Sequence, residues 1–507
     1  MKNYRFMDHD GLSACRPEAS ERGIALILAL LTLLCLSALG AGLIMLTQTE
    51  TWTTTNYKMT TQARYASESG LQQTLNWLTY TYSPSPAGLD LTKSPVEYGT
   101  PPRAVVLSAM SGVSANYPTT SVQTAFSAAL QDQPISGMGV PASYSVAATL
   151  LHMRMVRDMN GALVPVQTWR VVSRGRLNSA QRGAAKVELS ADVQTPTGPI
   201  FQYAAFGDAP VCASVHSGGN GTTDSYDSSV GPYSVSQSNT DGNLGSNGNI
   251  FVEGTSTHLH GSLQTPLSDS PGSCNAGSPD AMSINGSPII DGGLVPLPVP
   301  LVFPTPPPPS PLPPTTTYSV QGGNPCGTGP SALPGCGTIG PSGPSAEVTF
   351  APGLYGNITV NNKVVHLTAG TYTFNQLLLA GGAEIIVDSG PVVLQLAGQS
   401  LTGTPPVVLD MAGGSFVSNP TGNAANFYIA YGGTAEVHMR GSSDAYGVVY
   451  APNSNVTVYG SSHWYGSIIG NTVDVSGGVN LHYDRNLSSE FYITGALRAT
   501  AFSWNKF

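Results

Sequence analysis

The sequence predicts an α+β N-terminal part, in which a long helix lies on an antiparallel meander, followed by an all-β, right-handed parallel β-helix-like solenoid. Three observations support this. An uncharged, almost wholly apolar run from Ile24 to Leu46 continues as a polar helical segment to Tyr80. Three alternating, β-branched segments follow between residues 144 and 193. From about residue 201, short strand-like triplets recur every 17–20 residues.

The composition favours an exported, turn-rich protein. Only 10% of the 507 residues are charged, whereas Gly (58) and Pro (40) are abundant, as is typical of β-rich proteins with many tight turns. A chain of this length needs two or three domains beyond the helix. The net charge of −9, with no basic stripe, argues against nucleic acid as a partner.

The apolar run is long enough to span a membrane. At about 1.5 Å per residue, it crosses a bilayer core of about 30 Å as a helix. Four basic residues precede it, and the first one after it is Lys58, so the positive-inside rule exports everything beyond the run. An ordinary signal peptide, whose apolar region is only about 7–15 residues long, and a plain single-pass anchor are the alternatives.

The N-terminal region also resembles a known family. A basic leader ends in Arg22-Gly23, the apolar half-helix begins at Ile24, and the block Ala63–Leu71 (ARYASESGL) lies in the amphipathic half-helix. This arrangement is similar to the prepilin signal and stalk of PilX-type minor pilins. The resemblance implies that a prepilin peptidase cuts between Gly23 and Ile24. It also implies an inner-membrane protein with an exported C-terminal region, whose helix packs with other pilins.

One position departs from the pilin pattern. Major pilins typically carry Glu at the fifth residue after the Gly, where it pairs with a neighbour's charged N-terminus, and this chain has Leu28 there. The resemblance therefore implies a minor or initiating subunit rather than a major one.

Three predicted strands follow the helix, at residues 144–156, 164–177 and 184–193, separated by turn sequences. Antiparallel pairing would give the helix a surface on which to pack. Trp169–Gly175 resembles the corresponding strand of PilX-like relatives, although the local pattern also fits any small exported β-meander. Residues 81–140 show no sustained period and are expected to be loop-heavy, with short elements.

Internal repeats predict the solenoid. Gly353–Tyr355 recurs as Gly370–Tyr372, and Val456–Val458 recurs as Val473–Val475, each 17 residues later. Stacked coils of a parallel β-helix need such a period, because each coil has apolar residues that only its neighbours can cover. The four valines should then share one interior and Asp474 should face outward. A β-sandwich, which would show strands without the period, is the alternative.

The solenoid is expected to be interrupted by Pro296–Pro314. Such a run cannot join a β-ladder and favours polyproline II. We expect an exposed insertion between early and late coils, serving as a spacer or as a partner-recognition segment. Motifs around it, including Tyr446–Asn453 and Leu481–Asp484, match a domain that often follows PilX-type stalks and has no assigned activity.

Cysteine usage predicts two disulfides. Cys212, Cys274, Cys326 and Cys336 lie in the exported part, where an even number in an oxidising compartment favours pairing. Cys326 and Cys336 bracket a short Gly/Pro loop and are paired on that ground, whereas Cys212–Cys274 follows by elimination. A zinc site is the alternative, but the sequence has no Cys-x-x-Cys and no His near the second pair.

Parallel β-helices often carry glycosidases and lyases, and glycosidase chemistry needs two facing carboxylates. The candidate carboxylates here are scattered singly. His258 and His260 would face one side of a strand and could hold a metal, but no third ligand can be located, and Asx turns explain Asp224 and Asp227 more simply than calcium does. We therefore expect no enzyme, catalytic residue, metal or cofactor. The remaining candidates considered are Glu384, Asp388, Asp410, Glu436, Asp444 and Asp474, with His366, His438, His463 and His482.

These observations predict a minor pilin-like structural protein for a type IV pilus or related filament. Its expected partners are other pilins, the prepilin peptidase, the inner membrane and, through the head, a tip adhesin or surface glycan. A cell-surface adhesin and a carbohydrate-active β-helix enzyme on a single transmembrane helix are the alternatives.

The predicted parts are a cytoplasmic leader (1–23), a transmembrane and stalk helix (24–80), a pilin-like meander (81–200), the first part of the β-helix (201–287), a Pro-rich disulfide-closed insertion (288–345), the second part of the β-helix (346–487) and a C-terminal cap (488–507).

Overall fold

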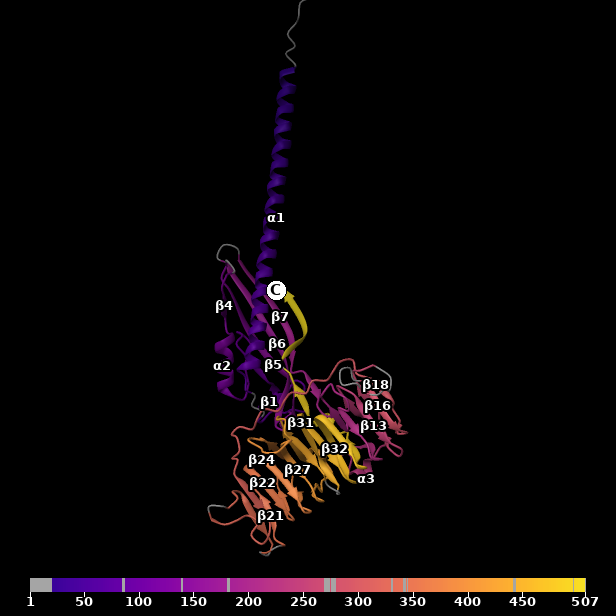
Figure 1. Cartoon of the computed structure of the whole chain (residues 1–507). Coiled ribbons are helices and arrows are strands. Elements are labelled where there is room, and N and C mark those ends of the chain that lie inside the picture. The colour runs from indigo at the N-terminus through magenta and orange to yellow at the C-terminus, as the bar shows by residue number, and fades with distance from the viewer. Residues whose placement is uncertain are drawn as a thin grey trace, which may run out of the picture.

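A long helix, a sheet against its second half and a large β-rich head follow one another along the molecule (Figure 1). Helix α1 (Glu21–Tyr80) projects alone over its first half. The computed structural model describes residues 21–83, 87–137, 140–179, 183–268, 274, 280–329, 332–340, 343, 345–440, 444–495 and 497–506.

The second half of α1 packs on a six-stranded sheet, and together they form the stalk. The predicted antiparallel meander is confirmed, because its three long strands are neighbours and begin and end within three residues of the predicted bounds. The strands are β3 (Val106–Ser108), β4 (Gln133–Ile135), β5 (Ala142–Arg157), β6 (Leu163–Ser179), β7 (Gly183–Gln194) and β35 (Arg498–Lys506).

The segment before the meander contains a helix that the sequence pattern missed. Helix α2 (Thr120–Leu130) buries Phe126 and Leu130, and Phe126 meets Trp77 of α1 edge to face, with ring centroids 5.1 Å apart. Val122, which is partly buried against the same core, Phe126 and Leu130 lie four residues apart, but three large apolar residues in a Ser/Ala/Thr-rich segment are a short signal for a sequence pattern. Two short strands, β1 (Glu97–Tyr98) and β2 (Arg103–Ala104), complete this segment.

The C-terminal segment does not cap the head, contrary to the expectation for residues 488–507. Strand β34 (Tyr492–Thr494) pairs antiparallel with β8 (Thr197–Pro199), and β35 then joins the stalk sheet beside β7. The C-terminus therefore lies against the stalk (Figure 1). The head is an insertion between two neighbouring strands of the stalk sheet, held at its base by the β8–β34 pair.

Residues 205–296, here called the first stack, form three columns of parallel strands. Successive strands along the chain enter successive columns, so three strands complete one coil. In stacking order the columns are β9 (Ala205–Gly207), β12 (Leu244–Ser246), β15 (Leu263–Thr265) and β18 (Leu294–Pro296); β10 (Val215–Ser217), β13 (Ile250–Gly254) and β16 (Met282–Gly286); and β11 (Thr222–Tyr226), β14 (His258–Leu259) and β17 (Ile289–Ile290).

Residues 317–484, the second stack, continue the pattern of parallel columns, except that β20 pairs antiparallel with β21 at the outer end. Its strands are β19 (Thr317–Val320), β22 (Gly353–Asn361), β24 (Gly370–Ala380), β26 (Val392–Leu396), β27 (Val407–Met411), β29 (Phe427–Tyr431), β30 (Glu436–Met439), β31 (Ala445–Tyr459), β32 (His463–Ser476) and β33 (Asn480–Asp484), with β20 (Cys336–Ile339), β21 (Glu347–Phe350), β23 (Val364–Leu367), β25 (Glu384–Val387) and β28 (Phe416–Ser418) in a smaller sheet.

The two stacks join in the reverse of their order in the sequence. Strand β32 pairs with β9 and β10, and β33 pairs with β11, so the last coil of the second stack lies directly on the first coil of the first stack. Val473, for example, pairs with Val215. The head is thus one closed parallel core that the chain enters and leaves at its middle, beside the stalk.

Residues 297–316, here called the strap, connect the two outer ends of the head. The expected exposed insertion at 288–345 is therefore corrected. Strands β17 and β18 belong to the first stack and β19 to the second. The strap runs along the core with Phe303, Pro306 and Pro313 buried, and the three-residue step between the first two matches polyproline II.

Hydrogen bonds fix the strap to both stacks. The Asn247 side-chain amide bonds the backbone of Leu301 in both directions, at 2.7 and 2.8 Å. The Tyr450 hydroxyl donates to the Pro304 carbonyl at 2.7 Å. A Cβ atom on Gly432 would lie 2.1 Å from the Pro306 carbonyl oxygen, so the strap passes directly over that glycine.

The predicted register of the four valines is confirmed, whereas the 17-residue spacing of the Gly353–Tyr355 repeat is not the spacing at which its strands pair. Val456 pairs with Val473 and Val458 with Val475, all four are buried, and the Asp474 side chain is 47% exposed. In contrast, Tyr355 pairs with Phe374 rather than with Tyr372. Coil length also varies, because loops at the corners lengthen some coils to about twice the predicted repeat.

Candidate functional site

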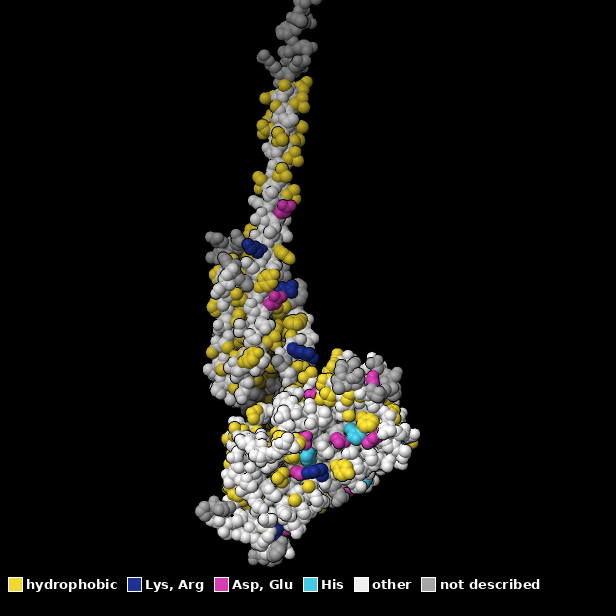
Figure 2. Space-filling view, viewed as in Figure 1, with side chains coloured by type: hydrophobic (Ala, Val, Ile, Leu, Met, Phe, Trp, Pro, Cys, Tyr) yellow, Lys and Arg dark blue, Asp and Glu magenta, His cyan; other side chains and the backbone are white. Residues whose placement is uncertain are grey.

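The first half of α1 is apolar and uncovered. From Ile24 to Leu46 its large apolar side chains are 57–72% exposed, and Figure 2 shows them along the projecting helix. Among the described residues, α1 is the one helix long and apolar enough to cross a membrane by its length and composition. Exposed apolar area on this scale is stable only against lipid or other apolar helices.

The predicted processing residues lie at the start of this segment. Gly23 is within the first turn of α1, and Ile24 is 59% exposed. Leu28, at the position where major pilins carry Glu, is 57% exposed. Residues 1–20 of the predicted leader lie outside the described residues.

Where the stalk is covered, two glycines allow a close helix–sheet contact. A Cβ atom on Gly70 would lie 2.4 Å from Ser173 Oγ, and one on Gly175 would lie 2.1 Å from the Ala63 carbonyl oxygen. Ser67 Oγ donates to the Ser173 carbonyl at 2.5 Å. The two motifs that resemble PilX-type pilins therefore meet each other in the fold.

The tip of the β5–β6 hairpin joins the stalk to the head. The Arg157 guanidinium donates to the Ala425 carbonyl at 2.8 Å and lies over the Phe491 ring. The Tyr428 hydroxyl donates to the Met159 carbonyl at 2.6 Å. These residues border a second apolar core outside the coils, which also takes in the strap residue Phe303. Its packing fixes the direction in which the stalk presents the head.

On the head's outer faces, histidines lie beside acidic groups, as one side of the head illustrates in Figure 2. His216 lies between Asp474 (2.8 Å) and Glu253 (3.2 Å), and the hydrogen bond to Asp474 is the main cause that raises the pKa of His216. His366 bonds Asp388 and Glu347 in the same way, at 2.9 and 3.0 Å. Burial lowers its pKa, but these two partners outweigh burial, and the net shift is upward.

A buried polar cluster lies where the two stacks meet. The His482 Nδ1 atom is 2.5 Å from Asp224, and its Nε2 atom is 2.7 Å from His463. The other Asp224 oxygen accepts from the Tyr233 hydroxyl at 2.6 Å and from Gln237 at 2.9 Å. Burial and then neighbouring His482 lower the pKa of His463. The sequence singled out the three residues separately. The pairing of β32 with β33 within the second stack brings the two histidines together, and the reversed order of the stacks adds Asp224 through the pairing of β33 with β11.

Asp291 joins the pair of histidines that lacked a third ligand. His258 Nε2 lies 2.9 Å from Asp291 Oδ1, and His260 Nδ1 lies 2.7 Å from Asp291 Oδ2. The sequence could not select Asp291, because its place opposite His260 follows from the pairing of β14 with β17.

Four of the six carboxylates considered for catalysis contact a cationic or titratable nitrogen. Asp388 bonds His366 and Asp474 bonds His216. Glu436 bonds His438 at 2.8 Å, and Asp410 pairs with Arg440. Glu384 has a pKa raised mainly by burial, whereas Asp444 is exposed. Each of the four accepts a hydrogen bond or lies in an ion pair with histidine or arginine, and at His216 and His366 a second carboxylate contacts the same ring.

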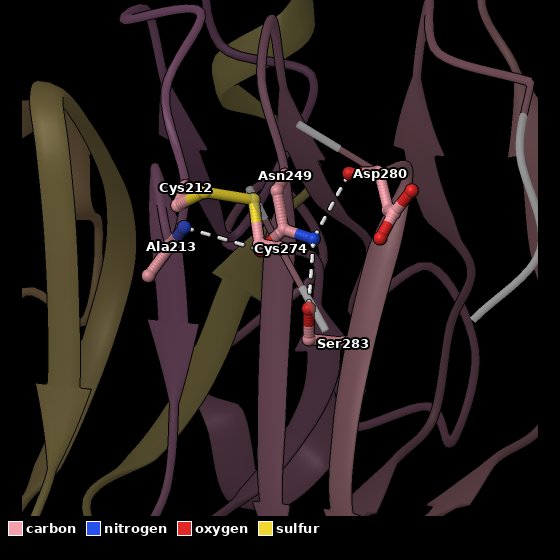
Figure 3. Close-up of a disulfide and its surroundings, with 6 residues drawn as sticks. All are labelled: Cys212, Ala213, Asn249, Cys274, Asp280 and Ser283. Atoms are coloured by element: carbon pink, nitrogen blue, oxygen red, sulfur yellow. Dashed lines mark hydrogen bonds between the residues drawn. A yellow bond between two sulfur atoms is a disulfide. The ribbon is translucent and has the colours of Figure 1, made fainter. Parts of the chain in front are cut away.

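Both predicted cysteine pairs are bonded in the structure. Cys212–Cys274 links the loop after β9 to the loop after β15 (Figure 3), and Cys326–Cys336 closes the loop between β19 and β20. Beside the first disulfide, buried Asn249 accepts from the Ala213 amide and donates to the Asp280 carbonyl and to Ser283. These contacts tie three successive coils together.

Comparison with known proteins gives two findings. Residues 352–490 match a family described as "Domain of unknown function (DUF7305)". Among solved structures, the chain is similar to the crystal structure of the competence-associated pilin ComZ from Thermus thermophilus, at 13% identity and a TM-score of 0.25, covering 89% of this chain and 98% of that chain. A likeness this distant does not establish a shared fold, and the architecture is described by the elements given above. No curated protein matches the chain.

Proposed function

We propose that the chain is an exported, membrane-inserted, pilin-like structural subunit, a minor component of a type IV pilus or related filament. The observation that carries the proposal is the division of α1 into an uncovered apolar half and a half packed on the stalk sheet. The apolar half lies in the inner membrane before assembly and among the helices of other pilins afterwards. Because of this division, the apolar half can pass from lipid to contacts with other pilin helices while the second half stays packed on the stalk sheet.

The N-terminal residues support a minor rather than a major role. A glutamate at position 28 would pair with the N-terminus of a neighbouring subunit, whereas Leu28 cannot. The subunit therefore enters a filament made by others, after a prepilin peptidase has cut between Gly23 and Ile24.

The head, in this proposal, is a right-handed parallel β-helix that the filament displays, and it is not an enzyme. The pairing of its carboxylates with histidine or arginine supports a non-catalytic role. Its low-charge polar surface would meet a tip adhesin or a surface glycan.

N-terminal sequencing of the membrane-extracted protein tests the proposal. We expect a mature chain that begins at a methylated Ile24 and is recovered in sheared filament fractions. Gly23→Val should retain the leader and stay in the membrane, whereas Gly40→Val, in the same helix with open space around its Cβ, should still be cut. A native start at Met1, or beyond Leu46, would overturn the proposal.

A further inference from the structure

Two histidines and one aspartate converge at one corner of the first stack. His258 lies in β14 and His260 directly follows this strand, so their side chains leave on the same side, because alternate residues of an extended segment share a side. Asp291 follows β17 in the next coil and reaches both rings. One ligand atom from each residue lies within 4.8 Å of the other two, and this is the one group of three possible metal ligands among the described residues.

The backbone that carries these side chains is held by the stacking of the coils. The His260 amide donates to the Thr223 carbonyl at 2.9 Å, and the Asp291 amide donates to the Leu259 carbonyl at 3.1 Å. Leu259, between the two histidines, is buried in the core. The backbone positions of the two histidines are therefore fixed, and their ring centroids lie 3.8 Å apart.

We propose that His258, His260 and Asp291 bind a divalent transition-metal ion of the Zn²⁺ type. Imidazole nitrogen and carboxylate oxygen are ligands that Zn²⁺ prefers, with bonds of about 2.0–2.2 Å. A tetrahedral ion with such bonds needs ligand atoms about 3.3 Å apart. The nitrogen–oxygen distances of 2.7 and 2.9 Å would have to open by about half an ångström, which side-chain rotation allows.

The other histidine sites described in the head differ in arrangement. In the buried cluster, His482 contacts Asp224 and His463 through different ring nitrogens, so one ligand atom from each residue does not converge there. His216 and His366 each present one imidazole to two carboxylates, which is an arrangement suited to a protonated histidine. Here two imidazoles converge on the two oxygens of one carboxylate, and one ligand atom from each of the three residues lies within 4.8 Å of the others.

The site leaves a coordination position open to solvent. The Asp291 side chain is 45% exposed and that of His258 is 33% exposed. Asp224, which precedes His260 in its column, is already bonded to His482, Tyr233 and Gln237, so it is not a fourth ligand. The ion would then cross-link two successive coils near the outer end of the first stack, with water in its fourth position.

Metal analysis of the full-length, tag-free protein in detergent tests this inference. After dialysis against a chelator, the protein is incubated with Zn²⁺, desalted and measured by mass spectrometry of the metal. We expect one retained Zn²⁺ per chain and a higher thermal midpoint with the ion than without it. With Co²⁺ instead, the visible absorption of a nitrogen-ligated, tetrahedral ion should appear.

Single variants assign the ion to these residues. His258→Ala, His260→Ala and Asp291→Asn should each weaken Zn²⁺ binding by more than the 10–100-fold that loss of an outer partner causes. His366→Ala, a matched histidine beside two carboxylates, should retain the ion. Circular dichroism in chelator checks that each variant is folded. Failure of the native protein to retain Zn²⁺, or equal retention by the folded variants, would overturn the proposal without affecting the proposed role in a filament.

Discussion

The stalk and the head bury apolar surface in different ways. In the stalk, β5, β6 and β7 are consecutive hairpin neighbours, and one helix covers them. In the head, the strands are parallel and the partners are distant, so that Val215 pairs with Val473. The stalk meander thus depends on local pairing. The head depends on the pairing of β32 and β33 with β9, β10 and β11, here called the seam, which joins the two ends of the head's own sequence. The seam, the strap and the returning strand β35 connect segments that are far apart in the sequence.

The largest expected effect is unfolding of the head when a charge is buried in its core. Val458 is 2% exposed and lies in the coil next to the seam. Val458→Asp places an unpartnered carboxylate in the core, at a cost of several kcal/mol. We expect the head to lose its cooperative thermal transition in calorimetry while α1 and the stalk retain their circular dichroism.

Tyr459→Asp is the matched control for this variant, because Tyr459 is the next residue of the same strand and is 55% exposed. It should leave the transition in place. Equal effects of the two substitutions would show that burial in the coils is not what stabilises the head.

How much the sequence could predict differs between the same two regions. Periodicity located the half-helix, the meander and the shared interior of Val456 and Val473, because each follows from alternation or repeat spacing. The strand β35 and the order of the stacks could not be found in this way. They depend on pairings between distant residues that have no spacing signal.

The candidate metal site shows the same limit. Alternation along the strand placed His258 and His260 on one face from the sequence alone. Asp291 required the register of β17 on β14, and the corner loops that vary coil length hide that register from the sequence. Likewise, the Pro-rich run predicted polyproline II but not the surface against which it packs.

The second largest effect should come from the strap, which has no counterpart in the stalk. Phe303 is 8% exposed and lies 4.8 Å from the Phe206 ring, between centroids. Phe303→Ala should destabilise the head by about 3 kcal/mol and expose the strap to proteolysis. Val302→Ala, whose side chain is 80% exposed, is the control. If both variants resist protease equally well, the strap does not stabilise the head.

A smaller effect is expected where α1 meets the sheet. Gly175→Ala brings a Cβ to 2.1 Å from the Ala63 carbonyl oxygen, so the helix must move, at a cost of about 1–3 kcal/mol. Gly198→Ala, in β8 with open space around its Cβ, should be neutral. Chemical denaturation of the full chain measures both variants. A neutral Gly175→Ala would mean that the helix is held more loosely than these distances indicate.

The smallest expected effect is on the pH dependence of stability, and it concerns only the head. The pKa of His216 is raised in the folded protein, chiefly by its hydrogen bond to Asp474, above an unfolded value of about 6.5. The folded state therefore binds the proton more tightly than the unfolded state does. The resulting stabilisation is fully present below pH of about 6.5 and is lost as the pH rises through the raised pKa.

Asp474→Asn removes this carboxylate and should return the His216 pKa toward its ordinary value. Because Asp474 is 47% exposed, the loss of stability at pH 6 should stay below about 1 kcal/mol. The fall in stability between pH 6 and pH 8 should become shallower than in the native protein. Thermal unfolding across that range measures the slope, and nuclear magnetic resonance of the His216 ring measures its pKa. An unchanged His216 pKa in the variant would contradict the assigned cause, and it would leave Glu253, the second acidic neighbour at 3.2 Å, as the group that holds the proton.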